Sequence, residues 1–303
     1  MSDFVQQQNS ICDFATSDSW VILSPIEQSI KRKIEAVGTP LKDWDIKIYR
    51  GVLTGCNEAF IINTEKRDEI LANCQTEEER QRTDELIRPI LRGRDIKRYG
   101  YVDNGLYLIN THNGIRGRIP RIKIEDYPAV KAHLDQYWDR ISTRADKGDT
   151  PYNLRNCAYL EDFNKPKVVY MEIQTDNPEE GYPFPCYSFD EKRCVVLNTA
   201  YIMSSETTDP RYVLGILNSK LGKFLVKLYV TQLQERQFRM LSQYVMNFPI
   251  ARPTKEIEIE MSKLVHNVLV HQSKESENRI DELAFQIYKL SENEIKLLVG
   301  KQL

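Results

Sequence analysis

The sequence contains no apolar run that approaches the roughly 18 residues of a membrane-spanning helix. Its N-terminus lacks the basic, apolar and small-residue regions of a signal peptide. The six cysteines form no C-x-x-C pair, so the sequence indicates neither a disulfide framework nor a zinc site. We therefore expect a cytoplasmic protein with no membrane partner.

Signatures of cofactor and catalytic chemistry are also missing. The chain has no G-x-G turn, no P-loop and no N-P-P-[YF] tetrapeptide of the kind that holds a target adenine in amino-methyltransferases. Its four histidines lack the spacing of metal ligands, and His266 and His271 fall on different faces of a helix. We expect no catalytic residue, no metal and no cofactor in this chain.

The composition is that of a folded protein. The chain has 303 residues, of which 41% are apolar and 28% are charged, close to the average of globular proteins and far from disordered chains. This length allows one large domain or two modest ones, each with its own core.

Charge is segregated along the chain, although the net charge is only −2. Eight basic and two acidic residues lie between Arg92 and Lys123, and seven basic residues and one acidic residue lie between Ser219 and Lys255. By contrast, 65–85 holds eight acids and four bases, and 256–294 holds nine acids and four bases. Such segregation is typical of a protein with one basic face and an acidic back, but an ordinary solvated surface explains it equally well.

Local signals predict several helices. Ser24, Pro25 and Glu27 form a capping box with proline at the first helical position, and apolar residues then recur at helical spacing up to Gly38. Further helical stretches are expected to begin at Thr64, at Thr76 with Glu79 in a second capping box, at Ala129 (running to Arg144), and at Asp209-Pro210 (with a possible break at Asn218-Ser219).

Strands are predicted mainly in the middle of the chain. Alternation over 44–52 predicts a half-buried strand, and 59–62 is expected to be its return strand after a tight loop at 54–57. Other strand-like runs are 105–110, 166–173 and 182–203.

The C-terminal part is expected to be helical. Apolar residues recur at helical spacing after Thr254 and again around Leu283, and Ser291 with Glu294 opens a last short helix. We therefore predict an α+β fold: a mixed, strand-rich domain over 1–253, with its core at about 20–253, and a helical arm over 254–303.

The strongest candidate residues point to binding. Four cations surround Gly93 and Asp95 in 92–99, as a loop that binds phosphate or guanine requires. A second basic loop surrounds Gly117, and amide and guanidinium side chains, whose geometry matches base edges, cluster in 232–239. The candidate DNA-binding residues are Arg92, Arg94, Lys97, Arg98, Arg116, Arg118, Gln232, Gln234, Arg236, Gln237 and Arg239. We expect Phe238 to pack inward.

One pattern suggests an enzyme instead. Asp162 and Glu172 flank the apolar run 168–171, as the carboxylates of a metal-dependent nuclease do. Gln174 stands where such a site would have lysine. A protein-interaction subunit whose basic loops meet an acidic partner is a third interpretation.

Two segments resemble the hallmarks of a known family, the TaqI-like specificity (target-recognition) domains of type IIG restriction-modification enzymes. Residues 50–62 resemble "G-x-x-T-G-x-N-x-A-F-x-I", and 89–99 resemble "P-x-L-R-G-x-D-I-x-R-Y". Shorter matches are 126–128, 144–155, 166–169, 217–219 and 248–250, so the resemblance runs from about Trp20 to Arg252. Tyr152 and Phe248 depart mildly from the family, which often has tryptophan and leucine there.

The resemblance implies sequence-specific recognition of double-stranded DNA. The recognised site would be delivered to an adenine-specific, S-adenosylmethionine-dependent methyltransferase, and in many members to a linked cleavage domain. Those portions precede the recognition domain in the family and are not in this chain. The expected partners are therefore double-stranded DNA and a methyltransferase domain or subunit. Thr54, Gly55 and Asn57 of the first hallmark either contact DNA or only build their loop.

Overall fold

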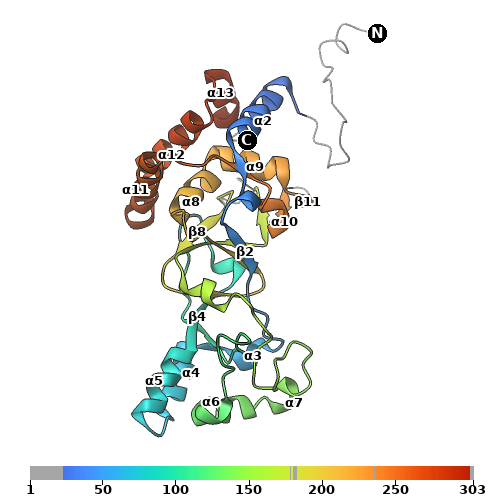
Figure 1. Cartoon of the computed structure of the whole chain (residues 1–303), viewed down its shortest axis with the longest axis vertical. Coiled ribbons are helices and arrows are strands. Elements are labelled where there is room, and N and C mark those ends of the chain that lie inside the picture. Colours follow the sequence, from blue (N-terminus) through green and yellow to red (C-terminus); the bar gives the residue numbers. More distant parts are fainter. Residues whose placement is uncertain (1–22, 178, 180–182, 235, 301–303) are drawn as a thin grey trace. The chain divides into compact units, whose positions relative to one another are not determined.

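The computed structural model describes residues 23–177, 179, 183–234 and 236–300 (Figure 1). The chain forms two compact units. Unit 1 comprises Met1–Ile46, Gln174–Pro185 and Glu206–Leu303, and unit 2 comprises Lys47–Ile173 and Cys186–Ser205. The domain boundary expected after residue 253 does not coincide with an end of either unit's segments and stays a prediction. Residues 20–22 of the expected core and Tyr182 of an expected strand lie outside the described ranges.

Unit 1 is mainly helical. Its longer helices are α2 (Pro25–Val37), α8 (Pro210–Asn218), α9 (Lys220–Tyr229), α11 (Lys255–His271), α12 (Lys274–Ile287) and α13 (Glu292–Gly300), with the single turns η1 (Leu41–Asp43) and α10 (Ser242–Val245). Its strands are β1 (Thr39–Pro40), which pairs with β13 (Pro249–Ile250), and β11 (Gln232–Gln234), β12 (Gln237–Arg239) and most of β7 (Ile173–Thr175), which form a small sheet. Within the described ranges, no helix is both long and apolar enough to cross a bilayer.

The helix boundaries of unit 1 follow the local signals. Ser24 and Glu27 form the expected capping box of α2. Ser219 ends α8 and begins α9, because its hydroxyl accepts a hydrogen bond from the backbone N–H of Gly222 and donates one to the carbonyl of Ile216. The predicted break at this position is therefore confirmed.

Helix α11 packs against α8 and α12 (Figure 1). The contact with α8 is close at Gly215, where an added Cβ would lie 2.4 Å from the sulfur of Met261. Tyr288, which follows α12, accepts a hydrogen bond from the backbone N–H of Ala251 and donates one to the carbonyl of Pro249. The C-terminal helices therefore form part of the core of unit 1.

Unit 2 contains two four-stranded sheets. The first has the order β2 (Lys47–Arg50), β10 (Ala200–Ser204), β6 (Lys167–Met171), β8 (Tyr187–Asp190), and all its neighbours are antiparallel. The second has the order β3 (Ile61–Asn63), β5 (Leu106–Ile109), β4 (Ile87–Leu91), β9 (Val195–Val196), and its β4–β9 pair is parallel.

Helices and short turns complete unit 2. They are α3 (Asn57–Phe60), α4 (Thr64–Ala72), α5 (Glu77–Leu86), α6 (Pro128–Asp135) and α7 (Trp138–Ile141), with the 3-10 turns η2 (Gly93–Asp95), η3 (Ile124–Asp126) and η4 (Leu160–Asn164). Thr76 caps α5, while the Glu79 carboxylate accepts from the backbone N–H groups of Gln75 and Ala129. The α+β prediction is confirmed, with one apolar core that connects both sheets of unit 2.

Two expectations about unit 2 are wrong. Residues 59–62 are not the return strand of β2, because 57–60 form α3 and β3 pairs with β5 instead. The helix expected over 129–144 is interrupted at Gln136 and Tyr137, so that α6 and α7 are separate. In the first case the strand pairs with a partner that is distant in the sequence. In the second, the backbone of Tyr137 (φ −110°, ψ 16°) leaves the helical conformation.

Candidate nucleic-acid interface

The segment 92–99 contains a tight turn that its own side chains stabilise. The Arg92 guanidinium donates two hydrogen bonds to the Asp95 carboxylate, at 2.9 and 2.8 Å, and Asp95 also accepts from the Arg92 backbone N–H and the Asn104 amide. Burial opposes ionisation of Asp95, but these bonds from Arg92 lower the pKa of its carboxyl. The Arg92 guanidinium therefore mainly stabilises the turn.

The other cations of this segment are more available. Arg94 and Lys97 are exposed, and the Lys97 ammonium donates to the carbonyl of Arg94 at 2.9 Å. Arg98 is half-buried, with its guanidinium 4.9 Å from the ring centre of Tyr99. The segment thus offers Arg94 and Lys97 to a polyanion more readily than Arg92.

The second basic loop is a hairpin-like turn over 113–121. A bridge between Ile115 and Ile119 closes it, and Gly114 and Gly117 have positive φ angles of 74° and 78°. At Gly114 an added Cβ would lie 2.4 Å from the carbonyl oxygen of Ile119, so only glycine fits. The turn holds Arg116 and Arg118 at its exposed tip.

Arg144 anchors the neighbouring loop over 144–156, although no local pattern in the sequence predicts that this arginine is buried. Its buried guanidinium donates to the backbone carbonyls of Thr54, Asp146, Pro151 and Asn153, and it lies over the ring of Phe60. Burial lowers the pKa of Arg144 to about 10. This side chain therefore fixes the shape of the loop.

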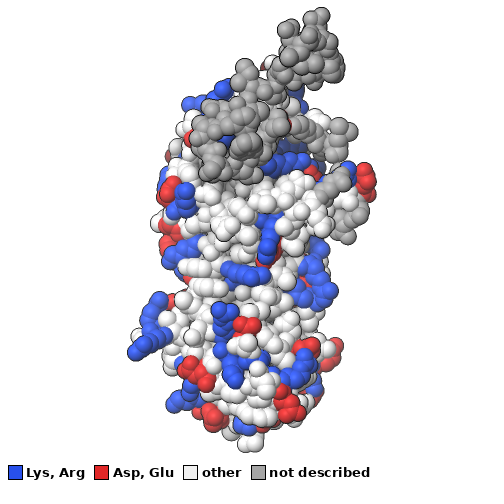
Figure 2. All heavy atoms as spheres, turned by 90° about the vertical axis from the view of Figure 1, so that its right-hand side faces the viewer, with Lys and Arg blue, Asp and Glu red and all other residues white. Residues whose placement is uncertain are grey.

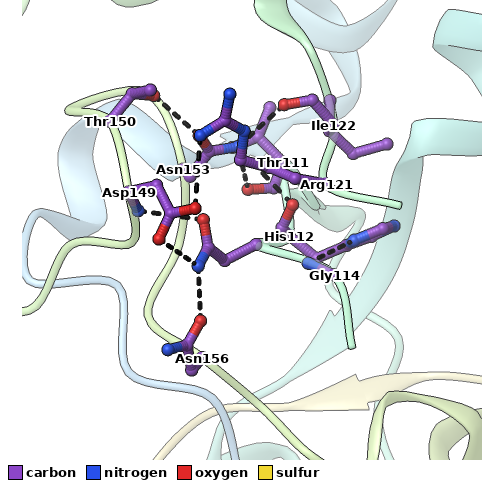
Figure 3. A network of polar contacts seen from close by, with 10 residues as sticks. Thr111, His112, Gly114, Arg121, Ile122, Asp149, Thr150, Asn153 and Asn156 are labelled. Atoms are coloured by element: carbon purple, nitrogen blue, oxygen red, sulfur yellow. Dashed lines mark hydrogen bonds and ion pairs between the residues drawn. The ribbon is translucent and has the colours of Figure 1, made fainter. Parts of the chain in front are cut away.

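Asn153 joins this loop to the hairpin turn (Figure 3). Its buried amide nitrogen donates to the carbonyl of Ile122 at 2.9 Å and reaches those of Thr111 and His112 at 3.4 and 3.5 Å. Its amide oxygen accepts from the Thr150 hydroxyl at 2.7 Å. The two loops are consequently held as one piece.

An exposed polar network lies on these two loops (Figure 3). The Asn113 amide nitrogen donates to Asp149 at 2.9 Å and to the Asn156 amide oxygen at 2.5 Å, and the other Asp149 oxygen accepts from Arg121 at 3.2 Å. These residues line an open hollow of about 740 Å³ together with Arg116 and Arg118 of the turn. We refer to it as the loop hollow.

Of the residues around the loop hollow, the sequence singled out only Arg116 and Arg118. Arg118 forms an ion pair with Glu161, and both side chains are exposed. Arg121 belonged to the basic stretch, but Asn113, Asp149 and Asn156 carried no signal of their own, because asparagine and aspartate are common in ordinary turns.

Thr54, Gly55 and Asn57 build the loop that precedes α3. The buried Thr54 hydroxyl donates to the Asn57 side-chain oxygen at 2.6 Å and accepts from the Cys56 backbone N–H. Gly55 has a φ angle of 68°, which favours glycine. The carbonyl of Thr54 is also one of the acceptors of Arg144, so the first hallmark supports the loop over 144–156.

The amide and guanidinium cluster lies on the β11–β12 hairpin of unit 1. Gln232, Gln234, Arg236 and Arg239 are exposed and Gln237 is half-buried. Phe238 is buried as expected, and its ring stacks on that of Phe184 at 5.3 Å. Every second residue of β12 thus faces solvent while Phe238 anchors the hairpin.

The structure therefore divides the candidate residues between the two units. The arginines and lysine of 92–118 belong to unit 2, and those of 232–239 belong to unit 1. Figure 2 shows one face of the molecule, on which basic side chains are spread among uncharged ones with acidic side chains interspersed.

The carboxylates of the nuclease hypothesis are both engaged in other contacts. Asp162 is buried, pairs with Lys165 at 2.9 Å and accepts from the Ser204 hydroxyl at 3.0 Å, and Glu172 pairs with Arg50 at 2.9 Å. In the described part of the chain, no three His, Cys, Asp or Glu side chains are grouped so that they could hold a metal ion. The geometry gives the nuclease hypothesis no support.

Comparisons with known proteins agree with the sequence resemblance. The family profile "TaqI-like C-terminal specificity domain" matches residues 88–250, more than half of the chain. The type II methyltransferase M.BstVI of Geobacillus stearothermophilus is 22% identical over 294 residues, which cover 94% of this chain and 47% of that protein. The chain thus spans about half the length of this curated relative.

A solved structure with a TM-score above 0.5 gives a fold likeness. The type IIL restriction-modification enzyme MmeI, solved in complex with DNA, matches with a TM-score of 0.59 and 13% identity, over 86% of this chain and 36% of MmeI. The type IIG restriction endonuclease BpuSI matches with a TM-score of 0.47 and 11% identity, over 88% of this chain and 34% of BpuSI.

Proposed function

Because the chain belongs to the family of TaqI-like C-terminal specificity domains, we propose that it recognises a specific sequence in double-stranded DNA for a methyltransferase. The methyltransferase part, which would bind S-adenosylmethionine and modify an adenine, lies outside this chain. This chain then decides where modification, and in some arrangements cleavage, takes place. The family match over residues 88–250 is the observation that carries the proposal.

The positions of the basic side chains support this proposal. Arg94, Lys97 and Arg116 are exposed on turns that buried contacts hold in place, which suits contact with phosphates. Phosphate contacts supply affinity and orientation, whereas base edges supply sequence discrimination. The proposed phosphate or groove contacts are Arg94, Lys97, Arg98, Arg116 and Arg118, together with Arg92, whose guanidinium also holds the turn through Asp95.

The β11–β12 hairpin supplies the side chains that are proposed to contact base edges. A two-stranded ribbon fits the major groove of DNA, and glutamine and arginine match adenine and guanine edges there. The proposed base-edge contacts are Gln232, Gln234, Arg236, Gln237 and Arg239.

Selection from a randomised duplex library tests the proposed function. The purified chain is incubated with the library at low and at moderate salt, and the retained DNA is sequenced. We expect one motif to be enriched at both salt concentrations, since base contacts persist when phosphate contacts are screened. Arg94→Ala should weaken binding to all sequences alike and reduce the slope of log affinity against log salt by about 1.

Two results would contradict the proposal. Binding that disappears at moderate salt and enriches no motif would leave only sequence-independent electrostatic contact. No detectable binding to duplex DNA at low salt, together with salt-sensitive binding to an acidic protein, would favour the protein-interaction alternative.

A further inference from the structure

The loop hollow of unit 2 presents hydrogen-bond donors, although its residues include an aspartate. We propose that Arg121, oriented by Asp149, and Asn156 form a second base-reading site that selects guanine. This inference rests on the proposed function, because it names the base edge that this chain would read. It adds Arg121 and Asn156, which lie outside the two family hallmarks, the shorter matches and the β11–β12 hairpin, and it gives a role to Asp149 within the shorter match 144–155.

The loop hollow is assigned donor character because several of its side-chain oxygens already accept hydrogen bonds from neighbouring residues. Both Asp149 carboxylate oxygens accept hydrogen bonds, one from Asn113 and one from Arg121. The Asn156 amide oxygen accepts from Asn113, and the Asn113 oxygen accepts from the Asp149 backbone N–H. The Asn156 amide nitrogen and the remaining Arg121 N–H groups are left to meet a ligand.

A site whose unengaged side-chain nitrogens are all donors discriminates among bases. In the major groove guanine presents two acceptors, N7 and O6, whereas adenine presents N7 beside an amino donor and cytosine presents an amino donor. An amino group facing Arg121 and Asn156 would leave donors opposite donors. Guanine is therefore the base that this arrangement favours.

Asp149 gives Arg121 the geometry that such a contact needs. Arg121 is partly exposed, at 38% of its side-chain surface, and an exposed ion pair of this kind adds little stability. It does restrict the guanidinium to fewer orientations, which lowers the entropy lost on binding. The carboxylate therefore acts as a positioning group.

The supporting contacts below the network are rigid. Asn153 is buried and ties the hairpin turn to the neighbouring loop, and Arg144 is buried among four backbone carbonyls. Binding sites discriminate well when their contact residues stand on a shell that is itself fixed. The loop hollow has this construction, with buried anchors below and exposed amide and guanidinium groups above.

The test is library selection with the whole chain and its variants Arg121→Ala, Arg121→Lys, Asp149→Asn and Asn156→Asp. We expect Arg121→Ala to lose preference at one G·C position by about tenfold and to keep the rest of the motif. Asp149→Asn should loosen the same position without weakening binding to random duplex. Asn156→Asp should shift that position towards cytosine or adenine, because a carboxylate accepts from their amino groups.

Arg279→Ala is the matched control. Arg279 is also an exposed arginine held by carboxylates, those of Glu260 and Glu282, but it lies on α12 in the acidic C-terminal stretch. It should leave every position of the motif unchanged. Circular dichroism spectra and melting temperatures establish that each variant is folded, and the conservative Arg121→Lys keeps the charge if alanine disturbs the loop.

The outcomes separate this inference from the proposed function. If the parent chain enriches a motif but the Arg121 and Asp149 variants weaken binding uniformly, the inference is wrong and the proposed function stands. If the parent chain enriches nothing, the proposed function fails and the inference fails with it. Loss of preference at a single G·C position supports both.

Discussion

Lys167 and Asp190 form an ion pair with no exposed surface, in the first sheet of unit 2. Asp190 also accepts from the Tyr101 hydroxyl and from the backbone N–H groups of Lys192 and Cys194, and the Lys167 ammonium donates to the carbonyl of Phe163. Burial lowers the pKa of Lys167, although Asp190 opposes the shift. The pair survives burial because nearly every polar atom has a partner.

Removal of one member should therefore be costly. We expect Asp190→Ala to lower the free energy of unfolding by about 3–5 kcal/mol, because it leaves a buried ammonium without its counterion. The double variant Lys167→Met, Asp190→Leu should recover only part of this loss, because it removes the unpaired ammonium but leaves the Tyr101 hydroxyl and the Cys194 N–H without the acceptor that Asp190 supplies. Urea unfolding followed by circular dichroism measures both. Glu282→Ala, which breaks an exposed pair with Arg279, is the control and should cost less than about 1 kcal/mol.

Glu294 makes stability depend on acidity. Burial opposes ionisation of Glu294, but hydrogen bonds from Lys33, the Ser291 backbone N–H and the Ser29 hydroxyl outweigh it and lower its pKa to about 2. The unfolded chain takes up the proton near pH 4.5, so the contribution is complete above that pH and disappears as the pH falls towards 2.

Compared with Glu294→Gln, the parent chain should be more stable by about 1–3 kcal/mol at pH 7. The difference should shrink steadily between pH 4.5 and pH 2. Urea unfolding curves at several pH values give both numbers. A difference that is constant over this range would show that the carboxylate carries no charge-dependent contact.

At the residue scale, the sequence shows which residues are basic but not which basic side chains are already bound to other groups of the protein. Arg92 and Arg144 look like any surface arginine in the sequence, yet one is bound by Asp95 and the other by four carbonyls. Their partners are set by the folded backbone, as Thr54 and Arg144 illustrate, because they are far apart in the sequence and adjacent in the fold. Only the Asp95 partner was visible locally.

At the scale of elements, the hairpin turn over 113–121 shows two glycines with similar backbone angles and different surroundings. At Gly114 an added Cβ would meet backbone atoms, the nearest at 2.4 Å, whereas at Gly117 it would meet nothing within 4 Å. Both have positive φ angles, so alanine is strained at either position. Steric overlap adds to the strain only at Gly114.

We expect Gly117→Ala to cost about 1 kcal/mol and to leave DNA selectivity intact. Gly114→Ala should cost more, because the backbone of Ile119 has to move, and that movement should displace Arg121 and loosen the preference for the G·C position. Thermal melting and library selection, performed on both variants, provide the comparison. Equal effects at the two glycines would mean that the turn tolerates movement.

Helices were more predictable than strands for a physical reason. The boundaries of α2 and of the α8–α9 break depend on caps within a few residues, which the sequence shows directly. Strand β3 depends on β5, more than forty residues later, so no local pattern could identify its partner. The sequence therefore placed these capped helix boundaries well, missed α3 and the interruption of 129–144, and misassigned the pairing of 59–62.

On the scale of the whole molecule, the question is whether the C-terminal helices fold independently of the rest of unit 1. The sequence suggested an arm over 254–303, while the structure packs α11 on α8 and uses Tyr288 to hold the chain near Ala251. Helix α8 has an apolar face that is buried along most of its length. Truncation after residue 253 would uncover part of that face.

We expect the truncated chain 1–253 to bind a hydrophobic dye and to be cleaved by proteases within unit 1, while unit 2 resists. Limited proteolysis with mass spectrometry locates the cuts. The intact chain is the control. A truncated chain that unfolds cooperatively and binds no dye would instead support 254–303 as an independent arm.

Neither unit is a single stretch of chain, since the polypeptide leaves unit 1 after Ile46, returns for 174–185 and returns finally at Glu206. In genetic terms, one contiguous DNA segment encoding 47–205 carries all of unit 2 with one short strip of unit 1. A recombination event bounded by these two junctions could exchange the loop hollow between relatives as a cassette. An exchange that ended inside 174–185 would split unit 2 between two parents, because 47–173 and 186–205 would come from different sources. Successful natural chimaeras should therefore have their crossovers outside that strip.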